Sequence, residues 1–193
     1  MELTKEFWEL RYKNNDIGWD VGEITPPLKA YFDQLEDKSL SILIPGAGNS
    51  YEAEYLHKLG FINVVVVDIA PTAILKFKDR VEGFPNPHVI NANFFELCGR
   101  FDIIIEQTFF CAIDKKLRLN YAEQAHKLLN PKGKIVGLMF DAPLNEDHPP
   151  FGGSIDEYQT CFNPFFDIQV MESAHNSIKP RAGRELFVKM IKK

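Results

Sequence analysis

Short apolar runs and amphipathic segments alternate along most of this chain. Five apolar runs have the length and composition of strands, at 40–44, 63–68, 88–90, 101–105 and 135–140. Segments with apolar residues at helical spacing follow three of them, at 51–59, 70–81 and 114–129. Asn130-Pro131-Lys132-Gly133 is expected to end the last of these helices. The alternation predicts a doubly wound α/β fold with a parallel sheet.

The C-terminal part of the chain departs from this alternation. After a long loop at 141–153, Ser154 opens a short helix that extends to Phe162. Residues 165–171 and 185–191 then have strand character, and the connector between them is too short and polar for a crossover helix. We therefore expect an antiparallel hairpin at the edge of the sheet.

A glycine-containing turn follows the first apolar run. Gly46 and Gly48 allow the chain to turn sharply and a ligand to lie against bare backbone, while the next helix directs its free amide groups into the same crevice. Asp68 ends the second run, 20 residues after Gly48, where a carboxylate accepts the two hydroxyls of an adenosine ribose. The two features together predict an adenosine-containing cofactor.

The turn is incomplete as a dinucleotide-binding motif. Tyr51 stands three residues after Gly48, where such a motif needs a third small residue beneath the pyrophosphate. S-adenosylmethionine, which has no phosphate, is therefore favoured over NAD. A tight strand-to-helix turn without any ligand remains the alternative interpretation.

Three aromatic residues lie before the glycine turn. Residues 3–13 form a predicted helix that carries Trp8 and Tyr12, with Thr4 as its N-cap, and Trp19 ends the polar loop that follows. One interpretation is that these rings cover an edge of the core. The other is a lid that excludes water and attracts a positively charged sulfur through cation–π contact.

Two further segments follow the third and fourth apolar runs. In a parallel sheet, ligands bind outside the carboxyl ends of the strands, so residues 91–95 are expected to face the cofactor crevice. There Asn93 is a candidate to bind an adenine edge and Phe94 to pack on its ring, although one of Phe94 and Phe95 is expected to anchor the loop. The segment 106–111 is expected beside the cofactor sulfonium, between cofactor and substrate.

Composition limits the remaining possibilities. The chain has 193 residues, 45% of them hydrophobic, and a formal charge of -5, with Lys and Arg scattered along it. We expect one domain, with residues 1–36 as an N-terminal cover of the cofactor and substrate and 40–193 as its Rossmann-like core. No basic footprint for nucleic acid, no membrane-spanning run and no metal motif is evident. The three separated cysteines favour a reducing, cytoplasmic setting. We expect a small-molecule acceptor and a monomer or a weak dimer.

An ordered set of motifs resembles one family over nearly the whole chain. The chain resembles the S-adenosylmethionine-dependent methyltransferases of the thiopurine methyltransferase family, most closely its plant-type halide/thiol methyltransferase branch. The matching motifs are Phe7-Trp8 through Arg11-Tyr12, Gly18-Trp19-Asp20, Pro45-Gly46-Ala47-Gly48, Asp68-Ile69, Phe94-Phe95, Thr108-Phe109-Phe110-Cys111-Ala112, His148-Pro149-Pro150-Phe151 and Arg181-Ala182-Gly183-Arg184-Glu185.

The resemblance implies a fold and a set of site residues. The fold is a class I methyltransferase, with helices on both faces of a seven-stranded sheet in the order 3-2-1-4-5-7-6, strand 7 antiparallel. The cofactor would be S-adenosyl-L-methionine and its product S-adenosyl-L-homocysteine. By this resemblance the cofactor-binding residues are Trp8, Tyr12 and Trp19 as cover, Gly46 and Gly48 as turn, Asp68 at the ribose, Asn93, Phe94 and Phe95 at the adenine, and Gln107 and Thr108 at the methionine moiety and methyl group. The family usually has Asp at the position of Asn93, and many relatives have glycine at that of Ser50.

The expected reaction is methyl transfer to a small soft nucleophile such as a thiol, hydrosulfide or halide. A thiol with a pKa near ~8.5 is partly ionised at neutral pH, so the sequence requires no dedicated base. His148 and Arg181 are the candidate catalytic residues, with solvation and a pair with Glu185 as their alternatives, and Cys111 is expected to be a packing residue. Alternatives are an O- or N-methyltransferase that uses His148 or Glu106 as base, and a cofactor-binding interaction module without catalysis.

Overall fold

Seven strands form one sheet in the order β3-β2-β1-β4-β5-β7-β6, which confirms the predicted order. The computed structural model describes residues 2–193. Its strands are β1 (Ile42–Pro45), β2 (Val64–Asp68), β3 (Val89–Asn91), β4 (Phe101–Gln107), β5 (Leu129–Phe140), β6 (Phe166–Ser173) and β7 (Glu185–Lys192). Strand β7 pairs antiparallel with β5 and with β6, so the C-terminal hairpin is confirmed.

The chain divides into two compact units, residues 2–97 and 98–193. The helices of the first unit are α1 (Lys5–Lys13), α2 (Pro26–Phe32), α3 (Tyr51–Lys58) and α4 (Pro71–Arg80), with single 3₁₀ turns η1 (Asn86–His88) and η2 (Phe94–Glu96). Those of the second unit are α5 (Arg118–Leu128) and α6 (Ile155–Phe162), with η3 (Lys115–Leu117) and η4 (Lys179–Arg181). Within residues 2–193, no helix has the length and apolar character needed to span a bilayer.

The first unit is built on three parallel strands. Ile42 to Pro45 of β1 pair in register with residues 64–67, and β2 pairs with β3. All four residues of β1 are buried, as are four of the five in β2, which is why both runs are almost continuously apolar. Thr4 accepts a hydrogen bond from the amide of Phe7, so the predicted N-cap of α1 is confirmed.

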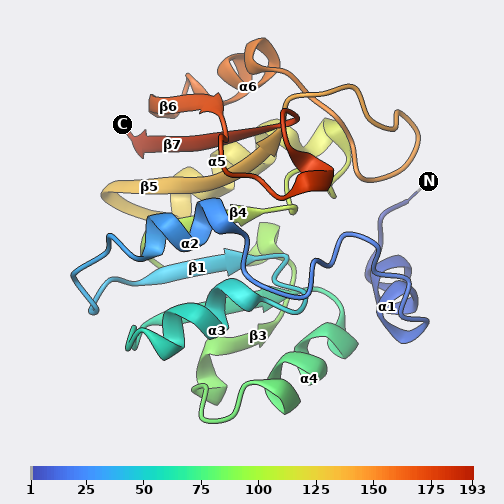
Figure 1. Ribbon diagram of the computed structural model, residues 1–193, viewed down its shortest axis with the longest axis vertical. Coiled ribbons are helices and arrows are strands. Elements are labelled where there is room, and N and C mark those ends of the chain that lie inside the picture. Colours follow the sequence, from blue (N-terminus) through green and yellow to red (C-terminus); the bar gives the residue numbers. More distant parts are fainter. Residues whose placement is uncertain (1) are drawn as a thin grey trace. The chain divides into compact units, whose positions relative to one another are not determined.

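The second unit contains β4 parallel to β5 and the two antiparallel C-terminal strands. Figure 1 shows β5, β7 and β6 side by side, in agreement with their pairing. Aromatic rings fill the core of this unit: Phe110 lies 5.1 Å from Tyr121, 5.7 Å from Tyr158 and 5.4 Å from Phe162, measured between ring centroids. These rings join the loop after β4 to both α5 and α6, so the loop is held by the core.

The predicted helix at 114–129 is wrong in its details. Asp114 does act as a cap, but for the short turn η3, and α5 begins only at Arg118. The helix ends at Leu128 because Leu129 already pairs with Phe101, and β5 continues through the turn-forming residues 130–133. Asn130 donates a hydrogen bond to Asp102 Oδ1 at 2.8 Å. Strand pairing thus outweighs the local preference of Asn-Pro-Lys-Gly for a helix terminus.

Candidate functional site

The glycine turn and the end of β2 are joined through one carboxylate. Gly46 and Gly48 have φ of 57° and 53°, values that glycine adopts without steric cost. The amide of Gly48 donates to Asp68 Oδ2 at 2.8 Å, and the amide of Ala70 donates to Oδ1 at 2.8 Å. The glycine turn and Asp68, both predicted to bind the cofactor, therefore lie together within the first unit.

Asp68 is almost completely buried, with 5% of its surface exposed. Burial raises the pKa of Asp68 to about 6, although hydrogen bonds from backbone amides act in the opposite direction. At neutral pH the side chain is therefore mainly a carboxylate, held by two amides in a fixed orientation. Such a group is suited to accept hydrogen bonds from the hydroxyls of a ribose.

The start of α3 offers a further polar atom. Ser50 precedes the helix in a left-handed conformation with φ of 45°, and its side chain is buried. The Ser50 Oγ atom has no hydrogen-bond partner in the structure, although it lies at the positive end of the helix. A buried hydroxyl without a partner, next to bare glycine backbone and a fixed carboxylate, fits a polar cofactor such as S-adenosylmethionine.

The three N-terminal aromatic residues pack together in the first unit. Trp19 lies 5.7 Å from Trp8 and 5.9 Å from Tyr12, measured between ring centroids and with edge-to-face geometry. Tyr12 is buried against Ala70 and Ala73, whereas Trp8 and Trp19 remain partly exposed. Tyr12 thus belongs to the core, and the two tryptophans form a partly open layer over it. Whether this layer closes over a cofactor stays a prediction.

Polar contacts fix the N-terminal segment to the turn and to α4. Glu9 accepts hydrogen bonds from the amide and the hydroxyl of Thr72, at 2.9 and 2.7 Å. This carboxylate serves as the cap of α4, whose own N-cap residue, Ala70, has no side-chain oxygen. Asp20 accepts from the side chains of Asn49 and Tyr51, which directly follow the glycine turn.

The segment after β3 contains the short turn η2. Asn93 caps η2, with its Oδ1 accepting from the amide of Phe95 at 3.1 Å and its Nδ2 donating to Glu96 at 3.2 Å. Phe94 is buried at 3% exposure, which agrees with the expectation that one of the two rings anchors the loop, and its packing on an adenine ring stays a prediction. The neighbouring Phe95 is only partly buried and keeps the candidate role.

In the second unit, Glu106 holds the turn after β4. Its Oε1 accepts from the amides of Phe109 and Phe110, each at 2.8 Å, and its Oε2 accepts from the hydroxyl of Tyr121 at 2.8 Å. Glu106 has no exposed surface, and burial raises its pKa to about 7. Since these hydrogen bonds occupy both oxygens and no surface is open to a substrate, the geometry argues against Glu106 as a general base.

Gln107 and Thr108 lie at the carboxyl end of β4, as the sequence predicts. Gln107 Oε1 is buried without a hydrogen-bond partner in the structure, and Thr108 adopts a left-handed conformation with φ of 58°. A buried acceptor without a donor is consistent with a ligand that supplies one, such as the amino group of a methionine moiety. The strained backbone of Thr108 is held by the bonds that Glu106 makes on the next two residues.

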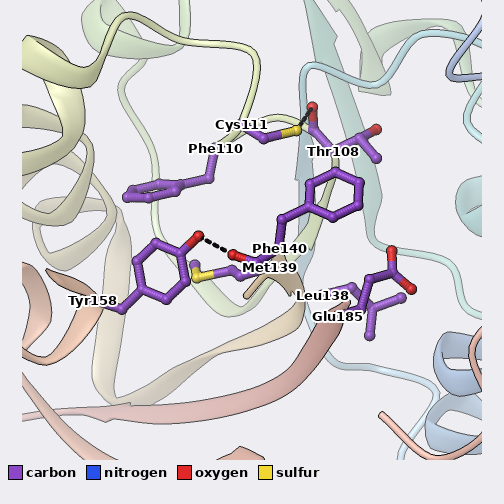
Figure 2. A pocket seen from close by; sticks show the side chains of 8 residues that line it. All are labelled: Thr108, Phe110, Cys111, Leu138, Met139, Phe140, Tyr158 and Glu185. Carbon is purple, nitrogen blue, oxygen red and sulfur yellow. Dashed lines mark hydrogen bonds between the residues drawn. The ribbon is translucent and has the colours of Figure 1, made fainter. Parts of the chain in front are cut away.

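A small cavity opens beside this turn, with a volume of about 10 Å³, which corresponds to about one water molecule. Its lining residues are Thr108, Phe110, Cys111, Leu138, Met139, Phe140, Tyr158 and Glu185 (Figure 2). The hydroxyl of Tyr158 donates to the carbonyl of Phe140 at 2.5 Å, and the thiol of Cys111 donates to the carbonyl of Thr108 at 3.3 Å. Five of the eight lining residues carry an aromatic ring or a sulfur atom.

Cys111 has the properties of a packing residue. The side chain is buried, and burial raises the pKa of its thiol to about 12. A thiol with this pKa stays protonated at neutral pH and is a poor nucleophile. The expected packing role therefore agrees with the structure.

The two candidate catalytic residues are placed differently. His148 lies in an exposed loop, with Nε2 3.7 Å from a carboxylate oxygen of Asp147, and it does not line the cavity. Arg181 is buried, and its Nη1 lies 3.4 Å from Oε1 of Glu185, a lining residue. The structure thus contains the Arg181–Glu185 pair, and a role of either candidate in substrate binding stays a prediction.

Five of the lining residues were not assigned to the site from the sequence, and Leu138, Met139 and Phe140 were identified only as part of a strand. Tyr158 was identified only as part of a helix, and Glu185 only as a partner of Arg181. The sequence does contain a signal for Glu185, because it is a carboxylate at the start of a strand of mostly apolar residues. Burial of a carboxylate is unfavourable unless it has hydrogen-bonding or charged partners. The loop at 141–153 is tied to the segment after β4, because the amide of Phe151 donates to the carbonyl of Cys111 at 2.7 Å.

Gly48→Ala tests how tightly the glycine turn is packed. A Cβ atom at this position would lie 2.5 Å from the hydroxyl oxygen of Tyr12, in addition to the strain of its positive φ. We expect Gly48→Ala to lose about 1–3 kcal/mol of unfolding free energy. The control Gly60→Ala has a φ of 86° but nothing within 4 Å, and should lose less. Denaturant unfolding measures both, and removing the hydroxyl with Tyr12→Phe should recover part of the loss. Equal losses in the two alanine variants would contradict the close packing.

Comparison with known proteins identifies the family. A family model described as thiopurine S-methyltransferase (TPMT) matches residues 3–192. A protein named probable thiol methyltransferase 2 from Arabidopsis thaliana is 29% identical over 185 residues, covering 92% of this chain and 81% of the relative. Thiocyanate methyltransferase 1 of Brassica oleracea is 26% identical with the same coverage of both chains.

A solved structure supports the fold independently of sequence. The 1,6-didemethyltoxoflavin-N1-methyltransferase of Burkholderia thailandensis, crystallised with bound S-adenosylhomocysteine, matches with a TM-score of 0.75. The match covers 98% of this chain and 87% of that chain at 16% identity, so it bears on fold alone. The match to the family model over residues 3–192 shows that this chain belongs to the thiopurine S-methyltransferase family of S-adenosylmethionine-dependent methyltransferases.

Proposed function

We propose that this protein transfers the methyl group of S-adenosylmethionine to a small soft nucleophile, namely a thiol, hydrosulfide or halide. The observation that carries this proposal is the small cavity lined by Phe110, Cys111, Met139, Phe140 and Tyr158. Aromatic rings and sulfur atoms are polarisable and interact favourably with a polarisable acceptor atom. The names of the plant relatives, a thiol and a thiocyanate methyltransferase, support the same acceptor class.

The proposed cofactor site in the first unit rests on Asp68 and the glycine turn. The Asp68 carboxylate would accept the ribose hydroxyls, and the bare backbone at Gly46 and Gly48 would allow close approach. Trp8, Tyr12 and Trp19 would exclude water from this side. Asn93 and Phe95 would bind the adenine, with Phe94 as the anchor of their loop.

In the second unit, Gln107 and Thr108 are proposed to bind the methionine moiety and to lie beside the methyl group. S-adenosylmethionine, when bound, supplies a methyl group activated by a positively charged sulfur. The protein's contribution to an in-line displacement is then mainly orientation of the acceptor and exclusion of water. Thr108 lines the cavity, which supports an acceptor bound there.

The alternative of an O- or N-methyltransferase has weaker support. The candidate bases for a catechol or amine acceptor in the sequence are His148 and Glu106, and neither is placed to accept a proton in the cavity. Glu106 accepts three hydrogen bonds in the interior, and His148 lies outside the cavity.

A panel of acceptors tests the proposed function. Purified protein would be incubated with S-adenosylmethionine and, in turn, hydrosulfide, iodide, an aromatic thiol, a catechol and an amine, and methylated products quantified. We expect turnover of soft nucleophiles only. Turnover confined to the catechol or the amine would contradict the proposed acceptor class, and turnover of none of them, with cofactor bound, would favour an interaction module.

A further inference from the structure

Glu185 places a carboxylate in the wall of the acceptor cavity. It is the first residue of β7, and its side chain lies among the cavity-lining groups in Figure 2. Only 3% of its surface is exposed. The other lining residues are apolar or carry a hydroxyl or thiol, so Glu185 is the single carboxylate among the eight.

Two neighbours hold this carboxylate in position. Ser177 Oγ donates to Oε2 at 2.8 Å, and Arg181 Nη1 lies 3.4 Å from Oε1. Both donors come from the connector between β6 and β7 and are part of the second unit. One carboxylate oxygen thus accepts from a hydroxyl and the other lies within ion-pair distance of a guanidinium, so the two contacts fix the orientation of the carboxylate.

The other two ionisable residues that line the cavity, Tyr158 and Cys111, are poor proton acceptors. The hydroxyl of Tyr158 donates a hydrogen bond to the carbonyl of Phe140, and burial raises the pKa of both the Tyr158 hydroxyl and the Cys111 thiol, so both groups stay protonated at neutral pH. Asp141 is a neighbouring carboxylate, because it follows Phe140, the residue that pairs with Glu185 across β5 and β7, but it does not line the cavity. Burial also raises the pKa of Glu185, with Ser177 and Arg181 opposing the rise, so its basicity is brought nearer to neutral pH.

We propose that Glu185 accepts the proton of a neutral thiol bound in this cavity and thereby selects thiols and hydrogen sulfide over acceptors that arrive as anions. This inference rests on the proposed function. A carboxylate in a cavity of low polarity attracts an S–H donor and repels iodide or thiocyanate, since opposite and like charges interact strongly away from water. Glu185 is thus both a catalytic residue and a determinant of specificity.

Proton transfer to Glu185 accompanies methyl transfer to the sulfur of the thiol. The S–H bond of the thiol breaks and its proton forms an O–H bond with Glu185. The electron pair left on sulfur forms the new S–CH₃ bond, while the electron pair of the broken bond to the methyl group remains on the sulfur of the leaving S-adenosylhomocysteine. Glu185 afterwards releases its proton to water.

Glu185→Gln tests the proposal because the amide keeps the shape of the side chain and removes its basicity. In wild-type protein, the thiol methylation rate should level off above the pKa of Glu185. In Glu185→Gln it should follow the thiolate concentration, rising about tenfold per pH unit up to the pKa of the thiol near ~8.5. Iodide has no proton to lose and escapes repulsion in the variant, so its methylation should be unchanged or faster.

A second variant covers the case in which Glu185→Gln fails to fold. Ser177→Ala keeps the carboxylate but removes a donor that stabilises its charge, so the acidic limb of the thiol pH profile should move to higher pH. Glu172→Gln, exposed on β6, is the matched control and should keep the wild-type profile. Folding is checked by thermal unfolding and by binding of S-adenosylhomocysteine.

The outcomes separate this inference from the proposed function. A wild-type enzyme that methylates thiols, with Glu185→Gln and Ser177→Ala showing the same pH profile, overturns the role of Glu185 alone. Equal loss of iodide and thiol turnover in a folded Glu185→Gln also overturns it, since a base is needed only for the thiol. If the wild-type protein methylates no soft nucleophile at all, the proposed function itself fails.

Discussion

Replacement of Asp68 by Ala is expected to weaken the binding of S-adenosylhomocysteine roughly 10- to 150-fold, or by about 1.5–3 kcal/mol, the range for hydrogen bonds to a charged group. The reason is that the Asp68 carboxylate is fixed at the end of β2 by the amides of Gly48 and Ala70. Calorimetric titration measures the change directly. The exposed Asp79 of α4 provides a matched control, and Asp79→Ala should bind as the wild type does.

The same titration at several pH values tests whether affinity depends on ionisation of the Asp68 carboxylate. Burial raises the pKa of Asp68 to about 6, and the ionised form is the stronger hydrogen-bond acceptor. Wild-type affinity should therefore be constant well above pH 6 and weaken as the pH falls through this value. Asp68→Ala should lack this dependence, and unchanged affinity in that variant would contradict the ribose role.

Glu106→Ala is expected to have the largest effect on stability, lowering the unfolding free energy by about 3–5 kcal/mol. It would leave the amides of Phe109 and Phe110 and the hydroxyl of Tyr121 without their acceptor in the protein interior. The turn that carries Thr108 would lose its main support, so methyl transfer should fall as well. Denaturant unfolding measures the stability, and a loss below 1 kcal/mol would show that the three bonds contribute little.

Glu106→Gln serves as the conservative partner of this variant. Its amide oxygen can still accept from both backbone amides, so the fold should be kept. The wild-type pKa of about 7 in the folded state lies above the ordinary 4.5, so the folded protein binds more protons and its stability falls as the pH rises between these values. Glu106→Gln does not ionise, and its stability relative to the wild type should rise by on the order of 3 kcal/mol across this range.

Much of the fold and the core of the candidate site follow from local patterns in the sequence. Buried parallel strands require continuous apolar runs, and sharp turns with positive φ require residues such as Gly46 and Gly48. Asp68 could be identified as a candidate site residue because the length of one βαβ unit defines its position relative to the turn. Such features depend on backbone geometry, which the local sequence largely determines.

Features that depend on tertiary contacts were harder to predict. The early start of β5 at Leu129 results from pairing with β4, and the burial of Phe94 rather than Phe95 depends on how one short turn faces the core. Glu185 enters the cavity wall because β7 pairs in a particular register with β5, placing it opposite Phe140. No local pattern encodes that register by itself.

Calorimetric titration of the purified wild-type protein with S-adenosylhomocysteine is the most direct test of the account, since every proposed site residue depends on this cofactor. We expect micromolar binding of one molecule per chain that weakens below pH 6, in line with the pKa of Asp68. Absence of binding at neutral pH, in protein shown to be folded by thermal unfolding, would contradict the assignment of the glycine turn and Asp68 as a cofactor site.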